Sequence, residues 1–157
     1  MIQVICPVCG AALEPQGTAW RCVQGHCFDV ARQGYVNLLT VTQKHSRHPG
    51  DTREMVAARR AFLDAGWYAP IAKTLTDLVR RFCPEAASVL DAGCGEGYYL
   101  SQLGWVPERW GIDISRDAVR YAAARDRGAH WLTATAAHLP FADGGFDCVL
   151  SMFALTA

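Results

Sequence analysis

Short apolar runs bounded by glycine or polar residues fill the second half of the chain. Runs of about four to eight such residues are typical of buried β-strands. Strands are predicted from Ser88 to the glycine-rich turn that begins at Gly93, and over 110–115, 130–134 and 146–153, with a helix over 116–127. Strands that alternate with helices in this way predict an α/β fold with a parallel sheet and right-handed crossovers.

Apolar residues recur at helical spacing in the middle of the chain. One helix is predicted over about 52–65, with Asp51 and Glu54 as N-cap and capping box and Gly66 as its end. Its apolar positions are Met55, Ala58, Phe62 and Leu63. Residues 40–50, which are polar and basic and include Pro-Gly, predict a loop before it.

A second helix is predicted to begin near Pro70, because proline suits the first turn of a helix. Its apolar face consists of Ile71, Leu75, Leu78, Val79 and Phe82. Trp67 and Tyr68 lie between the two helices. Two interpretations fit this aromatic pair: a core contact at the junction, or one wall of a nucleotide-type pocket.

The composition is that of a globular domain, with 51% apolar residues, 19% charged residues and a mean hydropathy of +0.05. No apolar stretch reaches the roughly 18 residues that cross a bilayer, and the first residues lack the features of a signal peptide. We therefore expect a cytoplasmic protein without a membrane partner.

The formal net charge of zero hides an uneven distribution. Residues 41–84 carry eight basic and four acidic side chains, which is a net +4, whereas residues 85–157 carry five and nine, which is a net −4. The basic stretch fits either contact with nucleic-acid phosphates or a solvated helix face.

Four of the seven cysteines lie in the first 27 residues, as Cys6-Pro-Val-Cys9-Gly10 and Cys22-Val-Gln-Gly25-His26-Cys27. Two pairs of soft ligands at this spacing are typical of a structural zinc site, and Gly10 and Gly25 suit the turns that it needs. The fourth ligand is either His26 or Cys27, with His26 favoured. After the ligands, an aromatic run ends in a strand-like piece, and its Phe28 and Tyr35 either cover the zinc hairpin or stack on a nucleic-acid base.

The first predicted strand of the α/β part ends in an acid and a Gly-x-Gly-x-Gly turn formed by Gly93, Gly95 and Gly97, and this turn is predicted to lead into a helix. This spacing, with Asp91 before it and Asp113 at the end of the next strand, favours S-adenosylmethionine over a dinucleotide. A dinucleotide would place its pyrophosphate on the helix N-terminus, whereas S-adenosylmethionine has an ammonium that an acid such as Asp91 binds.

The remaining predicted contacts to S-adenosylmethionine come from the ends of the second and third strands. Asp113 is predicted to accept hydrogen bonds from ribose hydroxyls, the alternative being the N-cap of the next helix, for which Ser115 is better suited. Thr135 occupies the place that borders the adenine, and His138 is predicted to be a solvated loop residue.

Motifs that extend from Cys6 to about Met152 resemble the RlmA-type 23S ribosomal RNA (guanine-N1) methyltransferase family. They are Cys-Pro-x-Cys, Cys-x-x-x-His-x-Phe-Asp, Gly-Tyr-Val-Asn-Leu-Leu, Pro-Gly-Asp, Arg-Arg-Ala-Phe-Leu-Asp-Ala-Gly, Leu-Asp-x-Gly-Cys-Gly-Glu-Gly-Tyr-Tyr and Leu-Pro-Phe. Most of them lie outside the generic methyltransferase signature, so the resemblance is specific.

The resemblance implies an α/β protein with an N-terminal zinc ribbon followed by a Rossmann-like class I methyltransferase domain. We expect a zinc-binding domain over 1–40, a basic linker with helices over 41–84, and the N-terminal part of the methyltransferase domain over 85–157. The implied zinc ligands are Cys6, Cys9, Cys22 and His26, and the implied contacts to S-adenosylmethionine are Tyr68 and the turn Gly95-Glu96-Gly97. The implied partners are large-subunit ribosomal RNA, methylated at guanine N1 in a hairpin loop, and a second copy of the chain.

A complete fold of this class has seven strands, of which four are predicted here, so we expect an incomplete sheet with an apolar edge. The family has an aromatic-Ala-Pro turn on the acceptor side, where this chain has Phe153-Ala154-Leu155. No residue is assigned as the general base. We expect the chain to bind zinc and S-adenosylmethionine without turnover; the alternative is a zinc-ribbon RNA-binding module with a vestigial methyltransferase domain.

Overall fold

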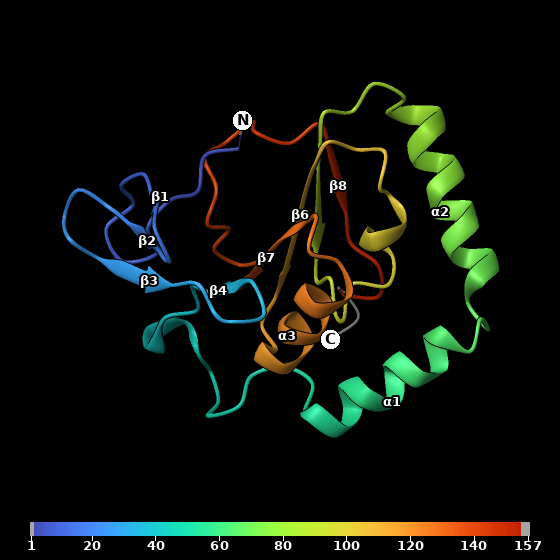
Figure 1. Cartoon of the computed structure of the whole chain (residues 1–157), viewed down its shortest axis with the longest axis horizontal. Coiled ribbons are helices and arrows are strands. Elements are labelled where there is room, and N and C mark those ends of the chain that lie inside the picture. The colour runs from blue at the N-terminus through green and yellow to red at the C-terminus, as the bar shows by residue number, and fades with distance from the viewer. Residues whose placement is uncertain (1, 155–157) are drawn as a thin grey trace.

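The computed structural model describes residues 2–154, so Leu155 of the acceptor-side turn lies outside the described residues. A small antiparallel sheet lies on the left in Figure 1, two long helices lie on the right, and a parallel sheet lies between them. Among the described residues, no helix is both long enough and apolar enough to span a membrane.

The parallel sheet has the strand order β4-β7-β6-β5-β8, and each neighbouring pair is parallel. Its strands are β4 (Tyr35–Asn37), β5 (Ser88–Ala92), β6 (Glu108–Asp113), β7 (His130–Thr133) and β8 (Cys148–Leu150). The four strands predicted in the second half are confirmed, with β6 beginning two residues early and β8 shorter than the predicted 146–153. Within the described residues β8 pairs with β5 alone, and Val149 is exposed at this edge.

β4 joins the far edge of the same sheet, although it comes from the predicted zinc-binding segment. Val36 is in register with Leu132 of β7, and the amide of Leu38 donates to the carbonyl oxygen of Thr133 at 2.8 Å. Tyr35 is buried, and its hydroxyl accepts a hydrogen bond from Arg116 at 3.1 Å. The interpretation of Tyr35 as an exposed base-stacking residue is therefore wrong, because its ring is part of the core.

The antiparallel sheet consists of β1 (Glu14–Gln16), β2 (Ala19–Arg21) and β3 (Cys27–Asp29), with β2 in the middle. It belongs to the N-terminal segment that also carries the cysteine pairs. This segment packs on the parallel sheet, where Trp20 meets Trp110 edge-on with ring centroids 6.4 Å apart.

Two cores lie on opposite faces of the parallel sheet, because side chains alternate between the faces along each strand. On one face, Leu90 and Ile112 pack with Val4 and Leu13 of the N-terminal segment. On the other face, Val89 packs with residues of helix α3 (Arg116–Arg125) and with Val79 of helix α2 (Ala69–Phe82). The N-terminal segment thus covers a face that would otherwise expose apolar side chains, and the domain boundary at residue 40 stays a prediction.

The predicted helices of the middle region are α1 (Arg53–Asp64) and α2. The predicted Asp51–Glu54 capping box is wrong: the N-cap is Thr52, whose hydroxyl accepts from the amide of Met55 at 3.3 Å. Asp51 instead forms an ion pair with Arg59 at 2.7 Å. The loop before α1 includes a short 3-10 helix, η1 (Val41–Gln43).

The glycine-rich turn after β5 does not lead directly into an α-helix as the sequence predicts. It is followed by a single 3-10 turn, η2 (Leu100–Gln102). Gly93, Gly95 and Gly97 all have positive φ angles, which a regular helix does not contain, so the chain stays irregular through the turn.

Candidate functional site

The four predicted zinc ligands converge on one point in the N-terminal segment. The candidate ligand atoms of Cys6, Cys9, Cys22 and His26 all lie within 4.8 Å of one another. Sγ of Cys22 lies 3.3 Å from Nδ1 of His26 and 3.7 Å from Sγ of Cys9. Tetrahedral zinc bound by thiolate and imidazole requires ligand separations of about 3.5 to 3.8 Å. The donor set therefore fits zinc, and Cys27 is exposed and outside it.

Two tight turns present these ligands. The amide of Gly10 donates to the carbonyl oxygen of Cys6 at 2.9 Å, and the amide of Gly25 donates to that of Cys22 at 3.0 Å. Both glycines have the positive φ predicted for them, 76° and 90°. Burial opposes ionisation of Cys22, but hydrogen bonds from His26 outweigh it and lower the pKa of the Cys22 thiol to about 6. A thiol that ionises readily is suited to bind a metal.

A cavity of about 850 Å³ opens at the carboxyl ends of β5, β6, β7 and β8. Ligands of open α/β sheets bind at this end of the strands. Six of the eight predicted cofactor residues line it: Tyr68, Gly93, Gly95, Glu96, Asp113 and Thr135. Asp91 and Gly97 are not among the lining residues.

Asp113 anchors the glycine turn within this cavity. Its Oδ2 accepts from the amide of Gly95 at 2.9 Å, and its Oδ1 accepts from the amide of Ser115 at 2.8 Å. Ser115 is the N-cap of α3, as expected, so Asp113 is free of that task. Burial raises the pKa of Asp113, and the two amide hydrogen bonds oppose that effect. Since a carboxylate has about four acceptor positions, Asp113 retains capacity for ribose hydroxyls.

Asp91 lies behind the turn and is 1% exposed. Its Oδ1 has no hydrogen-bond partner among the described residues. Burial, and to a lesser extent the charge of Asp113, raise the pKa of Asp91 to about 7. Burial of a carboxylate without a hydrogen-bond partner costs free energy, so an ion pair between Asp91 and a cation that reached it would be stabilising.

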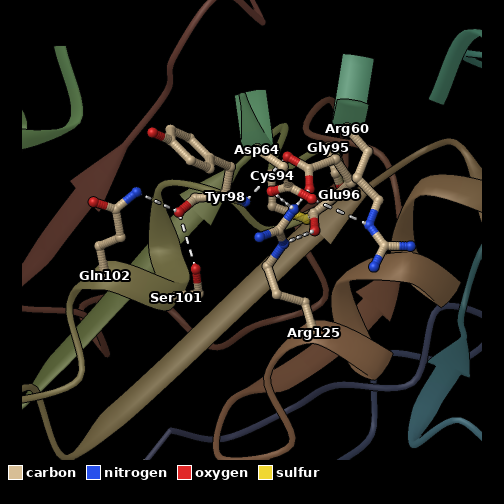
Figure 2. A network of polar contacts seen from close by, with 9 residues as sticks. All are labelled: Arg60, Asp64, Cys94, Gly95, Glu96, Tyr98, Ser101, Gln102 and Arg125. Carbon is tan, nitrogen blue, oxygen red and sulfur yellow. Dashed lines mark hydrogen bonds and ion pairs between the residues drawn. The ribbon is translucent and has the colours of Figure 1, made fainter. Parts of the chain in front are cut away.

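Glu96 lines the cavity, but its carboxylate is occupied by protein groups. It is 2% exposed, forms an ion pair with Arg125, and accepts from the amide of Tyr98 at 3.3 Å. Figure 2 shows Arg125 between Glu96 and Asp64 of α1. In this arrangement Glu96 holds the turn in place rather than pointing an unpaired charge at a ligand.

Gly97 allows the turn to pack closely against Trp131 and Ala122. Its φ is +88°, and a Cβ there would lie 2.9 Å from the Trp131 ring and 3.1 Å from Cβ of Ala122. By contrast, nothing lies within 4 Å of a Cβ at Gly95. Of these two glycines, therefore, only Gly95 leaves space for a ligand.

The sequence did not predict that one wall of the cavity belongs to the site. Gly50, Asp51, Arg59, Phe62 and Leu63 line it, from the end of the basic loop and from α1. Phe62 packs edge-on against Tyr68 with ring centroids 5.0 Å apart. The motifs Pro-Gly-Asp and Arg-Arg-Ala-Phe-Leu-Asp-Ala-Gly contain these residues. Because both motifs lie outside the generic methyltransferase signature, they could have indicated that these segments belong to the site.

The charges around the cavity favour a cationic ligand. Asp51 is paired with Arg59, and Glu96 is paired with Arg125. Across residues 2–154, neither Asp91 nor Asp113 forms an ion pair with a basic side chain. Asp113 is thus available to a ligand in the cavity that carries positive charge, whereas Asp91 is buried outside the lining.

Both parts of the chain match known families. Residues 4–47 match the family described as RlmA, N-terminal, and residues 89–157 match the family described as Methyltransferase domain. The chain is 41% identical over 95% of its length to the 23S rRNA (guanine(748)-N(1))-methyltransferase of Streptomyces fradiae, covering 54% of that protein. It is 34% identical over 94% of its length to a putative 23S rRNA (guanine-N(1)-)-methyltransferase of Bacillus subtilis, covering 55% of it. The chain therefore spans about half the length of these curated relatives.

Solved structures share the fold. DesVI of Streptomyces venezuelae aligns with a TM-score of 0.52 and 29% identity over 66% of this chain and 44% of its own. SAM-bound CalS10, an amino pentose methyltransferase from Micromonospora echinaspora, aligns with a TM-score of 0.54 and 22% identity over 69% of this chain and 45% of its own. These alignments confirm the predicted class of fold. The chain thus combines a segment that matches the RlmA N-terminal family with a segment that matches a methyltransferase domain, and over almost all of its length it is similar to 23S rRNA (guanine-N1) methyltransferases.

Proposed function

We propose that this chain supplies the zinc ribbon and the cofactor-binding part of an S-adenosylmethionine-dependent enzyme that methylates guanine N1 in a hairpin loop of large-subunit ribosomal RNA. The observation that carries the proposal is the cavity at the glycine turn, with Asp91 and Asp113 as carboxylates without a basic partner among the described residues. The names of the relatives supply the RNA and the guanine atom.

The donor sets fit the two proposed ligands. Cys6, Cys9, Cys22 and His26 would hold zinc, which would stabilise the turns of the ribbon. The orphaned Oδ1 of Asp91 would accept from the ammonium of S-adenosylmethionine, and the space beside Gly95 would admit its amino-acid end. Tyr68 and Thr135 line the remaining wall.

S-adenosylmethionine, when bound, would supply an activated methyl group on a cationic sulfonium sulfur. The chain's part is to bind and orient it, because an in-line methyl transfer depends on the alignment of donor and acceptor. Asp113 holds the turn through Gly95 and would accept from the ribose hydroxyls. Phe62, Leu63 and Tyr68 form an apolar wall that would exclude water from the reacting atoms. Guanine N1 must lose its proton, and no described residue is assigned to that step.

The basic region over 41–84 is proposed to contact RNA phosphates, in line with its net charge of +4. A homodimer and a cytoplasmic location remain predictions from the family resemblance and from the composition.

Calorimetry with S-adenosylmethionine tests the proposal. The wild-type chain should bind, and Asp113→Ala should weaken binding at least about 100-fold, because it removes both the ribose acceptor and the anchor of Gly95. Asp143→Ala is the matched control, since Asp143 is exposed and outside the cavity. A wild-type chain that binds the RNA hairpin but not S-adenosylmethionine would instead support the RNA-binding module with a vestigial methyltransferase domain.

A further inference from the structure

Helix α1 forms a wall of the cavity although it is weakly embedded in the fold. Of its twelve residues only Val56 and Leu63 are buried. In Figure 1, α1 lies at the periphery, away from the centre of the parallel sheet. Side-chain contacts at its ends therefore matter for its position, since little apolar packing holds it.

Arg125 of α3 connects this helix to the glycine turn. Its guanidinium forms an ion pair with the carboxylate of Glu96, and its Nε donates to the carbonyl oxygen of Glu96 at 3.3 Å. The same guanidinium donates to Oδ1 of Asp64, the last residue of α1, at 2.9 Å. Figure 2 shows this bridge from α1 through Arg125 to the turn.

A second contact between α1 and α3 supports the bridge. Arg60 lies with its guanidinium 5.2 Å from the centre of the Tyr121 ring, and its Nε is 3.6 Å from Oδ2 of Asp64. Asp64 is thus oriented by one arginine of its own helix and bound by another from α3. Arginine suits this position because its planar fork makes several hydrogen bonds in fixed directions.

The two segments joined by Arg125 both contribute to the lining of the same cavity. Arg59, Phe62 and Leu63 line it from α1, and Gly93, Gly95 and Glu96 line it from the turn. The Asp64–Arg125–Glu96 bridge links these two parts of the lining. A change in their separation would change the contacts that the cavity makes with a ligand.

We propose that Arg125 is a positioning residue that sets the width of the cofactor cavity by holding α1 against the glycine turn. This inference rests on the proposed function, because it assigns S-adenosylmethionine to the cavity. Arg125 is not among the residues that line the cavity; it acts through Asp64 on one side and Glu96 on the other. Asp64 is the adjustable end of the bridge, since it is 45% exposed whereas Glu96 is buried.

Asp64→Asn tests the bridge with little risk to folding, because the side chain is exposed and asparagine has nearly the same shape. The matched control is Asp77→Asn, which removes an aspartate from an exposed ion pair with Lys73 on α2, away from the cavity. We expect Asp64→Asn to weaken S-adenosylmethionine binding about five-fold in calorimetry and to speed hydrogen exchange of the α1 amides. Asp77→Asn should change neither quantity, and Asp64→Glu should restore most of the affinity.

Unchanged affinity and unchanged α1 exchange in Asp64→Asn would overturn the inference. If the wild-type chain does not bind S-adenosylmethionine, the proposed function fails, and hydrogen exchange then decides separately whether the bridge holds α1. Arg125→Lys is the second variant, because it keeps a positive charge beside the buried Glu96 but loses the fork. It should weaken S-adenosylmethionine binding as Asp64→Asn does. A variant that carries both changes should bind S-adenosylmethionine no more weakly than Arg125→Lys alone, since both changes break the same link.

Discussion

The metal cluster and the cofactor cavity are assembled in opposite ways. All four ligands of the cluster lie between positions 6 and 26, on two short turns. The residues that line the cavity extend from Gly50 to Ala154 and come from loops, from α1 and from the carboxyl ends of four parallel strands. A local site is specified by the spacing of its residues, whereas a distributed site exists only once the whole fold has formed. Disruption of the two sites should therefore have different consequences.

Loss of the metal should have the largest effect. Cys6→Ser removes a buried ligand, and we expect it to lower the free energy of unfolding by about 5 kcal/mol or more, because a small ribbon depends on its metal. The effect should reach the parallel sheet, since Val4 and Leu13 of the N-terminal segment cover Leu90 and Ile112. Thermal unfolding followed by circular dichroism, with and without a zinc chelator, measures the change.

Cys27→Ser is the control for this variant, because Cys27 is exposed and lies outside the cluster. It should unfold at the wild-type temperature and remain sensitive to the chelator. Equal melting temperatures for the Cys6 and Cys27 variants would contradict a ribbon that is held together by metal.

The glycine turn provides the next comparison, since two glycines of one motif differ in their surroundings. Gly97→Ala places a methyl group 2.9 Å from Trp131 at a φ of +88°, and we expect a loss of about 3 kcal/mol in urea unfolding. Gly95→Ala enters open space at a φ of +56° and should cost about 1 kcal/mol, with its main effect on S-adenosylmethionine binding. A larger loss of stability for Gly95→Ala than for Gly97→Ala would show that their roles are exchanged.

An effect smaller than that of Gly97→Ala is expected from pH. Because the pKa of Asp91 is raised to about 7 in the folded protein, the folded state holds a proton that the unfolded chain releases above about pH 4. The contribution of Asp91 to the free energy of unfolding therefore falls as pH rises from about 4 to 7 and is constant above that range.

Asp91→Asn removes this dependence. Between pH 5 and pH 8, wild-type protein should lose roughly 2 kcal/mol more than the variant in urea unfolding. Saturating S-adenosylmethionine should reduce the difference, because its ammonium would stabilise the charged carboxylate. Parallel pH profiles for the two proteins would mean that Asp91 ionises normally despite its burial.

Local patterns in the sequence predicted the strands of the second half, both long helices and three of the four metal ligands, with His26 favoured over Cys27 as the fourth, as the family resemblance also implies. They also predicted that Asp113 and Thr135 meet, because the carboxyl ends of parallel strands share one edge of a sheet, whereas the place of Tyr68 in the cavity followed from the family resemblance. The prediction of Asp51 as the N-cap of α1 was wrong. Aspartate is a common N-cap residue, but here Asp51 forms an ion pair with Arg59. Thr52 is one residue closer to the helix, and its hydroxyl satisfies the amide of Met55 instead.

The partners of individual side chains could not be predicted. Glu96 and Arg125 are 29 positions apart, and nothing in their spacing indicates that they form an ion pair. The roles of Gly95 and Gly97 could not be separated either, since both are required by the motif and differ only in the neighbours that the fold brings to them.

The sequence by itself determined the metal-ligand cluster, the parallel strands and the glycine turn, because each depends on the spacing of residues within a short stretch of chain. The tertiary structure alone decided that Tyr35–Asn37 completes the parallel sheet, that the N-terminal segment covers one face of it, and that Arg125 joins α1 to the turn. These contacts join segments that are far apart in the chain, and burial and charge compensation select them only when the folded chain brings those segments together.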